Sequence, residues 1–183
     1  MYRAMLLGAI LSAMTVAPAA MAAPHTEEFH AVFSGFNEVG ALNAQSGAIL
    51  SEGRATLALK LDRAGQTLSF TLSFSGLSAS VTQAHIHFGK VHMAGGVMVF
   101  FCSNLAAAPA GTQPCPPNGG TVTGTLSAAN VLPIAGQNVP AGDFDALVDA
   151  LESDTAYANI HTTTFPAGEI RGEIRRGSGT HDD

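Results

Sequence analysis

Apolar and polar residues alternate along much of the chain with a period of two. The clearest run is Leu68-Ser69-Phe70-Thr71-Leu72-Ser73-Phe74, in which every second side chain is large and apolar. This period is typical of a strand that buries one face and leaves the other in water. Segment 55–61 shows the same alternation, and the turn residues 62–65 join the two segments into a predicted hairpin.

Six further segments have strand-like sequence and are separated by turn residues: 29–34, 83–88, 97–101, 121–126, 157–162 and 169–175. About eight strands in one chain predict an all-β fold, an antiparallel sandwich or barrel. Segment 143–151 departs from this pattern, because its apolar residues fall three, four and seven positions after Phe144. That spacing predicts one short amphipathic helix in a connection, packed on the sandwich.

The N-terminal segment 1–23 has the pattern of a secretory signal peptide. Arg3 gives it a basic start, an apolar stretch covers 4–16, and small residues at 19–23 suit cleavage after Ala22 or Ala23. The stretch is shorter than the roughly 20 residues of a membrane span. We therefore expect a secreted or periplasmic protein with no membrane span.

The mature chain is expected to form a single domain. We place that domain at 28–176, followed by a polar tail at 177–183. No internal repeat and no linker between two cores interrupts this region, and its length is ordinary for one domain.

Composition and charge remove several classes of protein. The 183 residues include 8 Lys and Arg against 14 Asp and Glu, a net charge of −6 that becomes −7 without Arg3. So few basic residues exclude a nucleic-acid interface, and 46% hydrophobic against 12% charged residues excludes a disordered chain. The sequence lacks the nucleophile motif Gly-x-Ser-x-Gly, a phosphate-binding loop and a dinucleotide fingerprint, so hydrolase and nucleotide-binding functions have no support.

The two cysteines, Cys102 and Cys115, flank a segment with Pro and Gly that suits neither helix nor strand. In an oxidising compartment we expect them to form one disulfide, worth about 3 kcal/mol in the chain-entropy model. The alternative is a pair of thiolate metal ligands, but the spacing matches no compact zinc or copper pattern.

Histidines occupy the polar positions of two predicted strands. His85 and His87 alternate with apolar residues in 83–88, and His161 occupies the same kind of position in 157–162. Because the apolar residues must face the core, we expect these imidazoles on the outer, wet face of the sheet. Arg171, between Glu169 and Glu173, is expected on the same face, where the simplest alternative role is a cross-strand ion pair of little energetic value.

Three imidazoles on neighbouring strands predict a copper or zinc site. His92, in the loop after the first strand, is a candidate fourth ligand. Such a site needs ring nitrogens within about 4 Å of one another, and its affinity should fall below about pH 6.5 because only neutral imidazole binds metal. On spacing alone, solvated strand histidines are the alternative, and His25, His30 and His181 are interpreted as incidental.

The chain also resembles the CHRD domain family, which is named for chordin and occurs in secreted bacterial proteins. The matching stretches are Phe33–Val39, Leu68–Leu77, Ala84–Gly89 and Tyr157–Gly172. The resemblance implies an immunoglobulin-like Greek-key sandwich that is distantly similar to copper-zinc superoxide dismutases. In those enzymes a His-x-His strand pair and a later His bind copper, and an Arg guides the anion.

Transferred to this sequence, the resemblance implies copper at His85, His87 and His161 and an anion-guiding role for Arg171. No separate zinc cluster is present, so a two-metal enzyme is not expected. Two functions stay open. The first is a secreted mononuclear copper protein, either a redox enzyme acting on a small anion or a copper carrier, with zinc as the second choice of metal. The second is a non-catalytic extracellular module that contacts a protein or glycan through the same face.

Overall fold

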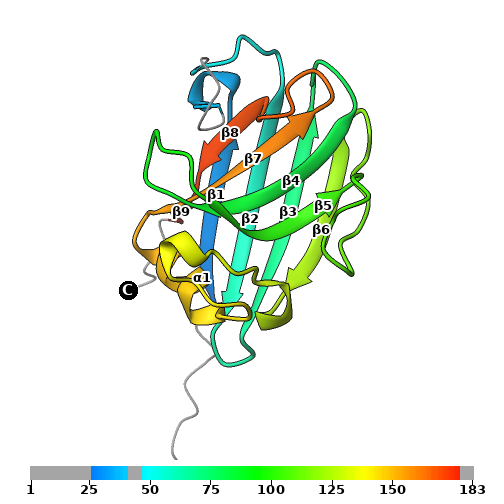
Figure 1. Ribbon diagram of the computed structural model, residues 1–183. Coiled ribbons are helices and arrows are strands. Elements are labelled where there is room, and N and C mark those ends of the chain that lie inside the picture. The colour runs from blue at the N-terminus through cyan, green and yellow to red at the C-terminus, as the bar shows by residue number, and fades with distance from the viewer. Residues whose placement is uncertain (1–25, 41–46, 178–183) are drawn as a thin grey trace, which may run out of the picture.

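The computed structural model describes residues 26–40 and 47–177, so the predicted signal peptide and nearly all of the polar tail lie outside the described residues (Figure 1). The strands within these ranges are β1 (Glu27–Phe33), β2 (Arg54–Asp62), β3 (Thr67–Ser75), β4 (Val81–Phe88), β5 (Gly96–Ser103), β6 (Gly120–Leu126), β7 (Ala156–Thr162), β8 (Ile170–Glu173) and β9 (Arg175–Arg176). The helices are α1 (Phe144–Glu152) and the short 3-10 turns η1 (Gly35–Asn37), η2 (Ala128–Asn130) and η3 (Ala135–Gln137).

The strands form two antiparallel sheets. One has the order β6-β3-β2-β1-β9, and the other has the order β5-β4-β7-β8. β3 pairs with β6 and β4 pairs with β7, although in each case two intervening strands lie between them in the chain. These Greek-key crossings, with one α-helix in the described part of the chain, confirm the predicted all-β sandwich.

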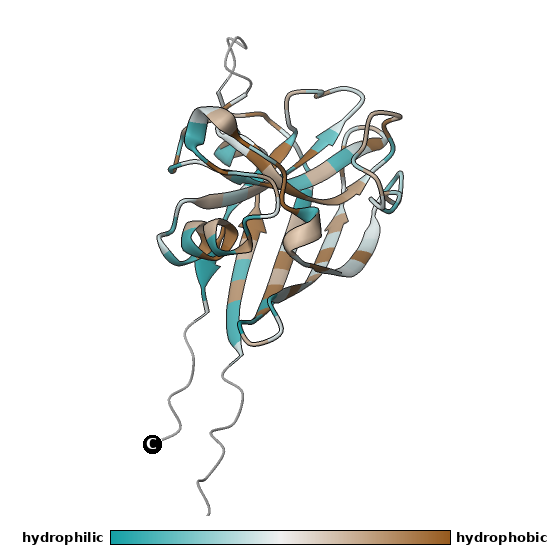
Figure 2. Cartoon of the chain, turned by 60° about the horizontal axis from the view of Figure 1, so that its bottom comes forward, coloured by the Kyte–Doolittle hydropathy of each residue, from teal (hydrophilic) through white to brown (hydrophobic). Residues whose placement is uncertain are grey.

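The alternation in the sequence becomes the core of the sandwich. β2 pairs with β3 along its whole length, from Arg54 opposite Ser75 to Asp62 opposite Thr67, which confirms the predicted hairpin. Every apolar member of the run in β3 is at most 5% exposed. Figure 2 shows the resulting bands of hydrophobic and hydrophilic residues along the strands of this sheet.

Helix α1 covers one end of the sandwich (Figure 1). The Asp143 side chain caps it by accepting a hydrogen bond from the amide of Ala146, and the buried face includes Phe144, Leu147 and Leu151. The predicted helix is therefore confirmed. No helix among the described residues has the length and apolar character needed to cross a membrane.

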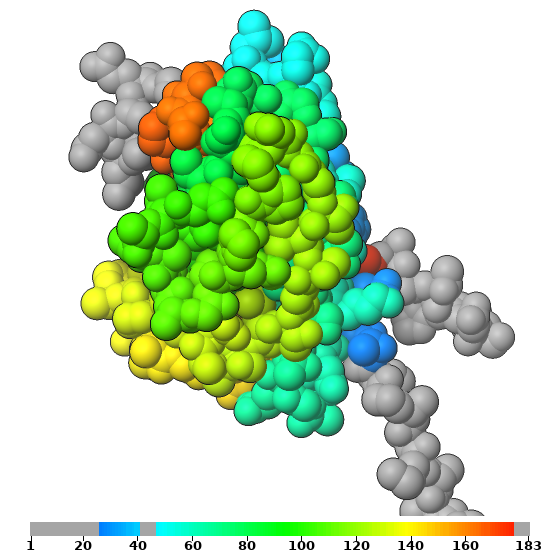
Figure 3. All heavy atoms as spheres, turned by 90° about the vertical axis from the view of Figure 1, so that its right-hand side faces the viewer, coloured from blue at the N-terminus to red at the C-terminus, as the bar shows by residue number. Residues whose placement is uncertain are grey.

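The connection between β5 and β6 lies on the side of the molecule seen in Figure 3. The predicted disulfide is present there, with 5.0 Å between the Cα atoms of Cys102 and Cys115. Gln113 also fastens the connection, because its side-chain amide donates to the carbonyls of Phe101 and Thr123 on the two strands.

The last predicted strand, 169–175, is not one strand. It is divided into β8, which pairs with β7, and β9, which pairs with β1 in the opposite sheet. Ile174, fully buried between them, marks the point where the chain crosses from one sheet to the other. Because apolar residues continue through the crossing, the sequence pattern did not reveal it.

Candidate metal centre

The polar face of the four-stranded sheet is buried. The exposed fractions are 2% for His85, 8% for His87, 6% for His161 and zero for Arg171. The prediction that these side chains lie on a wet outer face is therefore wrong. All seven residues of β7 are buried, so both faces of this strand are covered.

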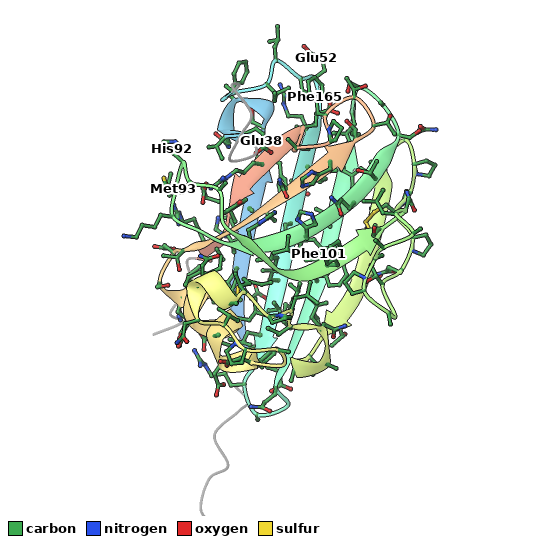
Figure 4. The ribbon with its side chains drawn as sticks, viewed as in Figure 1. Glu38, Glu52, His92, Met93, Phe101 and Phe165 are labelled. Atoms are coloured by element: carbon green, nitrogen blue, oxygen red, sulfur yellow. A yellow bond between two sulfur atoms is a disulfide. The ribbon has the colours of Figure 1, made fainter. Side chains whose placement is uncertain are left out.

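Two segments cover this face (Figure 4). One is the β4–β5 loop, where Arg171 Nη1 donates to the carbonyl of Met93 at 3.0 Å and the amide of Gly95 donates to the Tyr157 hydroxyl at 3.1 Å. The other is the segment after β1, where Asn37 Nδ2 donates to the carbonyl of Arg171 at 3.3 Å. Loops from distant parts of the chain thus exclude water from a face that the alternation marks as polar.

The three predicted strand histidines come together at the centre of this face. One ring nitrogen from each of His85, His87 and His161 can be chosen so that all three lie within 4.8 Å of one another. The His85 ring centroid is 4.6 Å from the centroid of each of the other two rings. β4 contributes the first two residues and β7, its antiparallel neighbour, contributes the third.

Hydrogen bonds to backbone carbonyls orient two of these rings. Nδ1 of His161 lies 2.8 Å from the Pro166 carbonyl oxygen, and Nδ1 of His87 lies 2.8 Å from that of Gly95. A carbonyl oxygen only accepts, so each Nδ1 carries the proton and each Nε2 has a free lone pair. Metal-binding histidines are commonly oriented in this way, with the ring nitrogen that does not bind the metal donating to a carbonyl or carboxylate oxygen.

Three nitrogens of the cluster lack a suitable partner. Nδ1 of His85 and Nε2 of His161 are buried without any hydrogen bond. Nε2 of His87 lies 3.1 Å from Oδ1 of Asn159, but a neutral ring that already donates through Nδ1 cannot donate to this second acceptor. The Nε2 lone pairs of His87 and His161 are therefore free for an electrophile, and no contact opposes the tautomer of His85 that leaves a lone pair on its Nδ1.

Burial holds the three rings in the neutral state. It lowers the pKa of His87 to about 4. It also lowers the pKa values of His85 and His161, and for His85 the neighbouring imidazoles act in the same direction. Neutral imidazole is the form that binds metal, so the residues are ready to bind at neutral pH.

The distances fit a metal after a small contraction. The three nitrogens lie within 4.8 Å of one another. At that largest separation each nitrogen would be about 2.8 Å from a common centre, whereas a metal–imidazole bond is about 2.0 Å long. The rings would have to move inward by roughly 0.8 Å to reach that bond length. This separation is wider than the 4 Å criterion set from the sequence, but the donor set and its protonation suit a mononuclear site.

Arg171 does not present its guanidinium to solvent. Its Nε donates to Glu173 at 3.0 Å and its Nη2 lies 2.9 Å from the same carboxylate, while Nη1 binds the loop. The guanidinium carbon also lies 3.3 Å from the centroid of the Tyr157 ring, which stacks on His87 at 4.6 Å. The ion pair lies within one strand, not across strands, and it fixes the loop and Tyr157 beside the cluster.

The remaining predicted residues lie apart from the cluster. His92 is exposed in the β4–β5 loop, and the structure does not bring it to the three histidines. His30 is exposed on β1, whereas His25 and His181 lie outside the described residues. Glu169, expected beside Arg171, is instead buried among hydroxyl groups of Ser51, Ser78 and Thr162.

Glu38 is a site residue that sequence reasoning missed. It is 4% exposed, one carboxylate oxygen has no partner, and burial raises its pKa although Arg171 and Asn159 act in the opposite direction. Gly168 leaves room for it, because a Cβ there would lie 2.4 Å from Oε2 of Glu38. Only its place in the stretch Phe33–Val39, one of those that carry the family resemblance, could have drawn attention to it.

Comparison with known proteins gives one family. A sequence model of the CHRD domain matches residues 29–174, which is most of the chain. No curated protein and no solved structure gives a significant match. The matched region contains every strand histidine of the cluster.

Proposed function

The chain belongs to the CHRD domain family, and we propose that it is an exported copper-binding protein whose three buried histidines hold one ion. The observation that carries this proposal is the convergence of His85, His87 and His161, with Nδ1 of His85 and Nε2 of His161 buried and unpartnered. A buried polar atom without a hydrogen bond costs about 1–3 kcal/mol. Coordination to a metal would remove that cost at several atoms together.

Charge favours copper over zinc. The three ligands are neutral, and no carboxylate joins their group among the described residues. The nearest fixed cation, Arg171, is paired with Glu173. Burying a single positive charge costs less than burying two, so such a site suits Cu(I) better than a divalent ion. Imidazole nitrogen is a ligand that copper accepts readily.

Burial favours a carrier over an enzyme of the dismutase type. None of the three histidines is more than 8% exposed. Arg171 is fully buried and each of its side-chain nitrogens already has a partner, so its guanidinium does not face an anion arriving from solvent. A carrier needs only slow, ligand-assisted access to the ion, whereas a redox enzyme needs an open position beside it.

The alternative function, a non-catalytic binding module, is left without an exposed contact surface. That hypothesis placed a protein or glycan against the face with His85, His87 and Arg171, and these side chains are buried.

Export is supported by the disulfide between Cys102 and Cys115, because such bonds persist in oxidising compartments.

Copper titration of the purified metal-free protein tests the proposal. Cu(I) supplied under ascorbate should bind as a single ion per chain and should be lost in the variant H85A/H87A and in H161Q. The control is H30Q, which removes an exposed imidazole of β1. Circular dichroism identifies variants that fail to fold. Equal, substoichiometric copper in the wild type and in folded H161Q would refute the site.

A further inference from the structure

The β4–β5 loop, residues 89–95, carries two exposed metal-binding side chains outside the histidine cluster. Met93 is 58% exposed and His92 is also exposed. The other methionine in the described part of the chain, Met98, is fully buried in the core. Figure 4 shows His92 and Met93 together at the outer edge of the loop. A thioether and an imidazole are therefore offered to solvent at adjacent positions.

The backbone of this loop keeps both side chains in that position. The amide of Met93 donates to the carbonyl of Lys90 at 3.0 Å, which closes a turn. His92 has a φ of 62°, in the left-handed region that few residues other than glycine adopt. A conformation of this kind costs energy and persists only where the surroundings hold it, so the loop has a fixed shape.

The same loop is tied to the ligands of the candidate metal centre. Arg171 donates to the carbonyl of Met93 at 3.0 Å, and Nδ1 of His87 donates to the carbonyl of Gly95 at 2.8 Å. Only Ala94 lies between Met93 and Gly95, so the Cα atoms of these two residues are at most about 7 Å apart. The exposed pair thus lies just outside the cluster, on the segment that covers it.

We propose that His92 and Met93 form a capture pair that takes up Cu(I) and passes it to His85, His87 and His161. This inference rests on the proposed function. Thioether sulfur and imidazole nitrogen both bind Cu(I), and two exposed ligands hold it less tightly than three buried ones. The step is a ligand exchange: bonds from copper to Sδ of Met93 and a ring nitrogen of His92 form as the donor's bonds break, and they break in turn as the buried imidazoles bind. No electron or proton is transferred.

Electrostatics near the capture pair suit copper that arrives as a neutral or anionic complex. The charge of Arg171, directly beneath the loop, is paired with Glu173. Lys90 is exposed in the same loop and leaves one unpaired positive charge nearby. These positive groups do not repel a neutral or anionic copper complex that approaches the loop.

The rate of copper loading tests the proposal. Metal-free protein is mixed with a bicinchoninate complex of Cu(I) under anaerobic conditions, and the loss of the complex's absorbance is followed. The variant H92N/M93L is matched to the structure, because Asn tolerates the left-handed conformation and Leu keeps the size of Met without its sulfur. H30N, a substitution of an exposed histidine on β1, is the control.

We expect H92N/M93L to load about tenfold more slowly, because a tethered capture pair raises the local concentration of copper beside the cluster. The final copper content should equal that of the wild type and of H30N. If H92N/M93L loads at the wild-type rate, the capture role alone is overturned. If H92N/M93L binds less copper at the end of loading, the capture role is also overturned, because His92 and Met93 would then be permanent ligands. A wild type that binds no copper would overturn the proposed function itself.

Discussion

The buried histidines should make the metal-free protein unstable in mild acid. All three have pKa values below the ordinary 6.5 in the folded state. Below that pH the unfolded chain binds protons that the folded chain does not, so the free energy of unfolding falls as the pH falls. The stabilisation is complete above the unfolded pKa and is lost progressively towards the folded pKa.

His87 alone gives a usable magnitude, because its pKa of about 4 defines the acid end of the range. Between about pH 7.5 and about pH 5, the unfolded histidine becomes mostly protonated while the folded one stays neutral, which costs about 2 kcal/mol. His85 and His161 add to this loss in the same direction. Glu38 opposes it in part, because burial raises the pKa of that carboxyl.

Guanidinium unfolding of the metal-free protein at the two pH values measures the effect, with H87Q as the comparison. The other titrating groups are common to both proteins, so the difference in pH dependence reports His87 together with its coupling to His85 and His161. We expect the wild type to lose about 2 kcal/mol more than H87Q on acidification. Equal losses in the two proteins would refute the claim that His87 is buried in the neutral state.

Four further outcomes follow from the structure. On acidification, copper affinity should begin to fall at a lower pH than the 6.5 of an ordinary imidazole, because the pKa values of all three folded ligands are lowered; competition titrations at several pH values measure this. C102S should lower the free energy of unfolding by about 3 kcal/mol through loss of the disulfide, measured in denaturant. E173A should cost about 3–5 kcal/mol because it leaves the buried Arg171 guanidinium without its counter-charge, and hydrogen exchange in the β4–β5 loop should accelerate. G168A should lower the melting temperature, because its Cβ would meet the Glu38 carboxylate at 2.4 Å and the backbone φ is 126°.

Most of the fold could be predicted because the chain follows a simple rule in most strands. In β2 and β3, buried and exposed residues alternate almost without exception, and a period of two in the sequence directly gives the face that packs. The helix was equally predictable, since its apolar spacing and its cap residue agree. The crossing at Ile174 was not, because a buried residue between two sheets looks the same as one inside a strand.

The histidine cluster was predicted correctly in its members and wrongly in its environment. Period and spacing place His85 and His87 on one face, and adjacent strands bring His161 to them. Burial of that face depends on the β4–β5 loop and on the segment after β1, which are held there by Arg171 and Asn37. Such long-range coverage leaves no periodic signal in the sequence, so the polar positions of β4 and β7 looked solvated.

That unexpected burial is what makes a binding role more convincing than a purely structural one. Exposed imidazoles would be hydrated at little cost, whereas Nδ1 of His85 and Nε2 of His161 have neither water-accessible surface nor a partner. At about 1–3 kcal/mol for each such atom, well-packed apolar side chains of similar volume would give a more stable sandwich. The stability that the metal-free protein lacks because of these unpartnered nitrogens would be recovered when they bind an ion. The acid sensitivity, the unpartnered nitrogens and the proposed copper site are thus consequences of the same three buried rings.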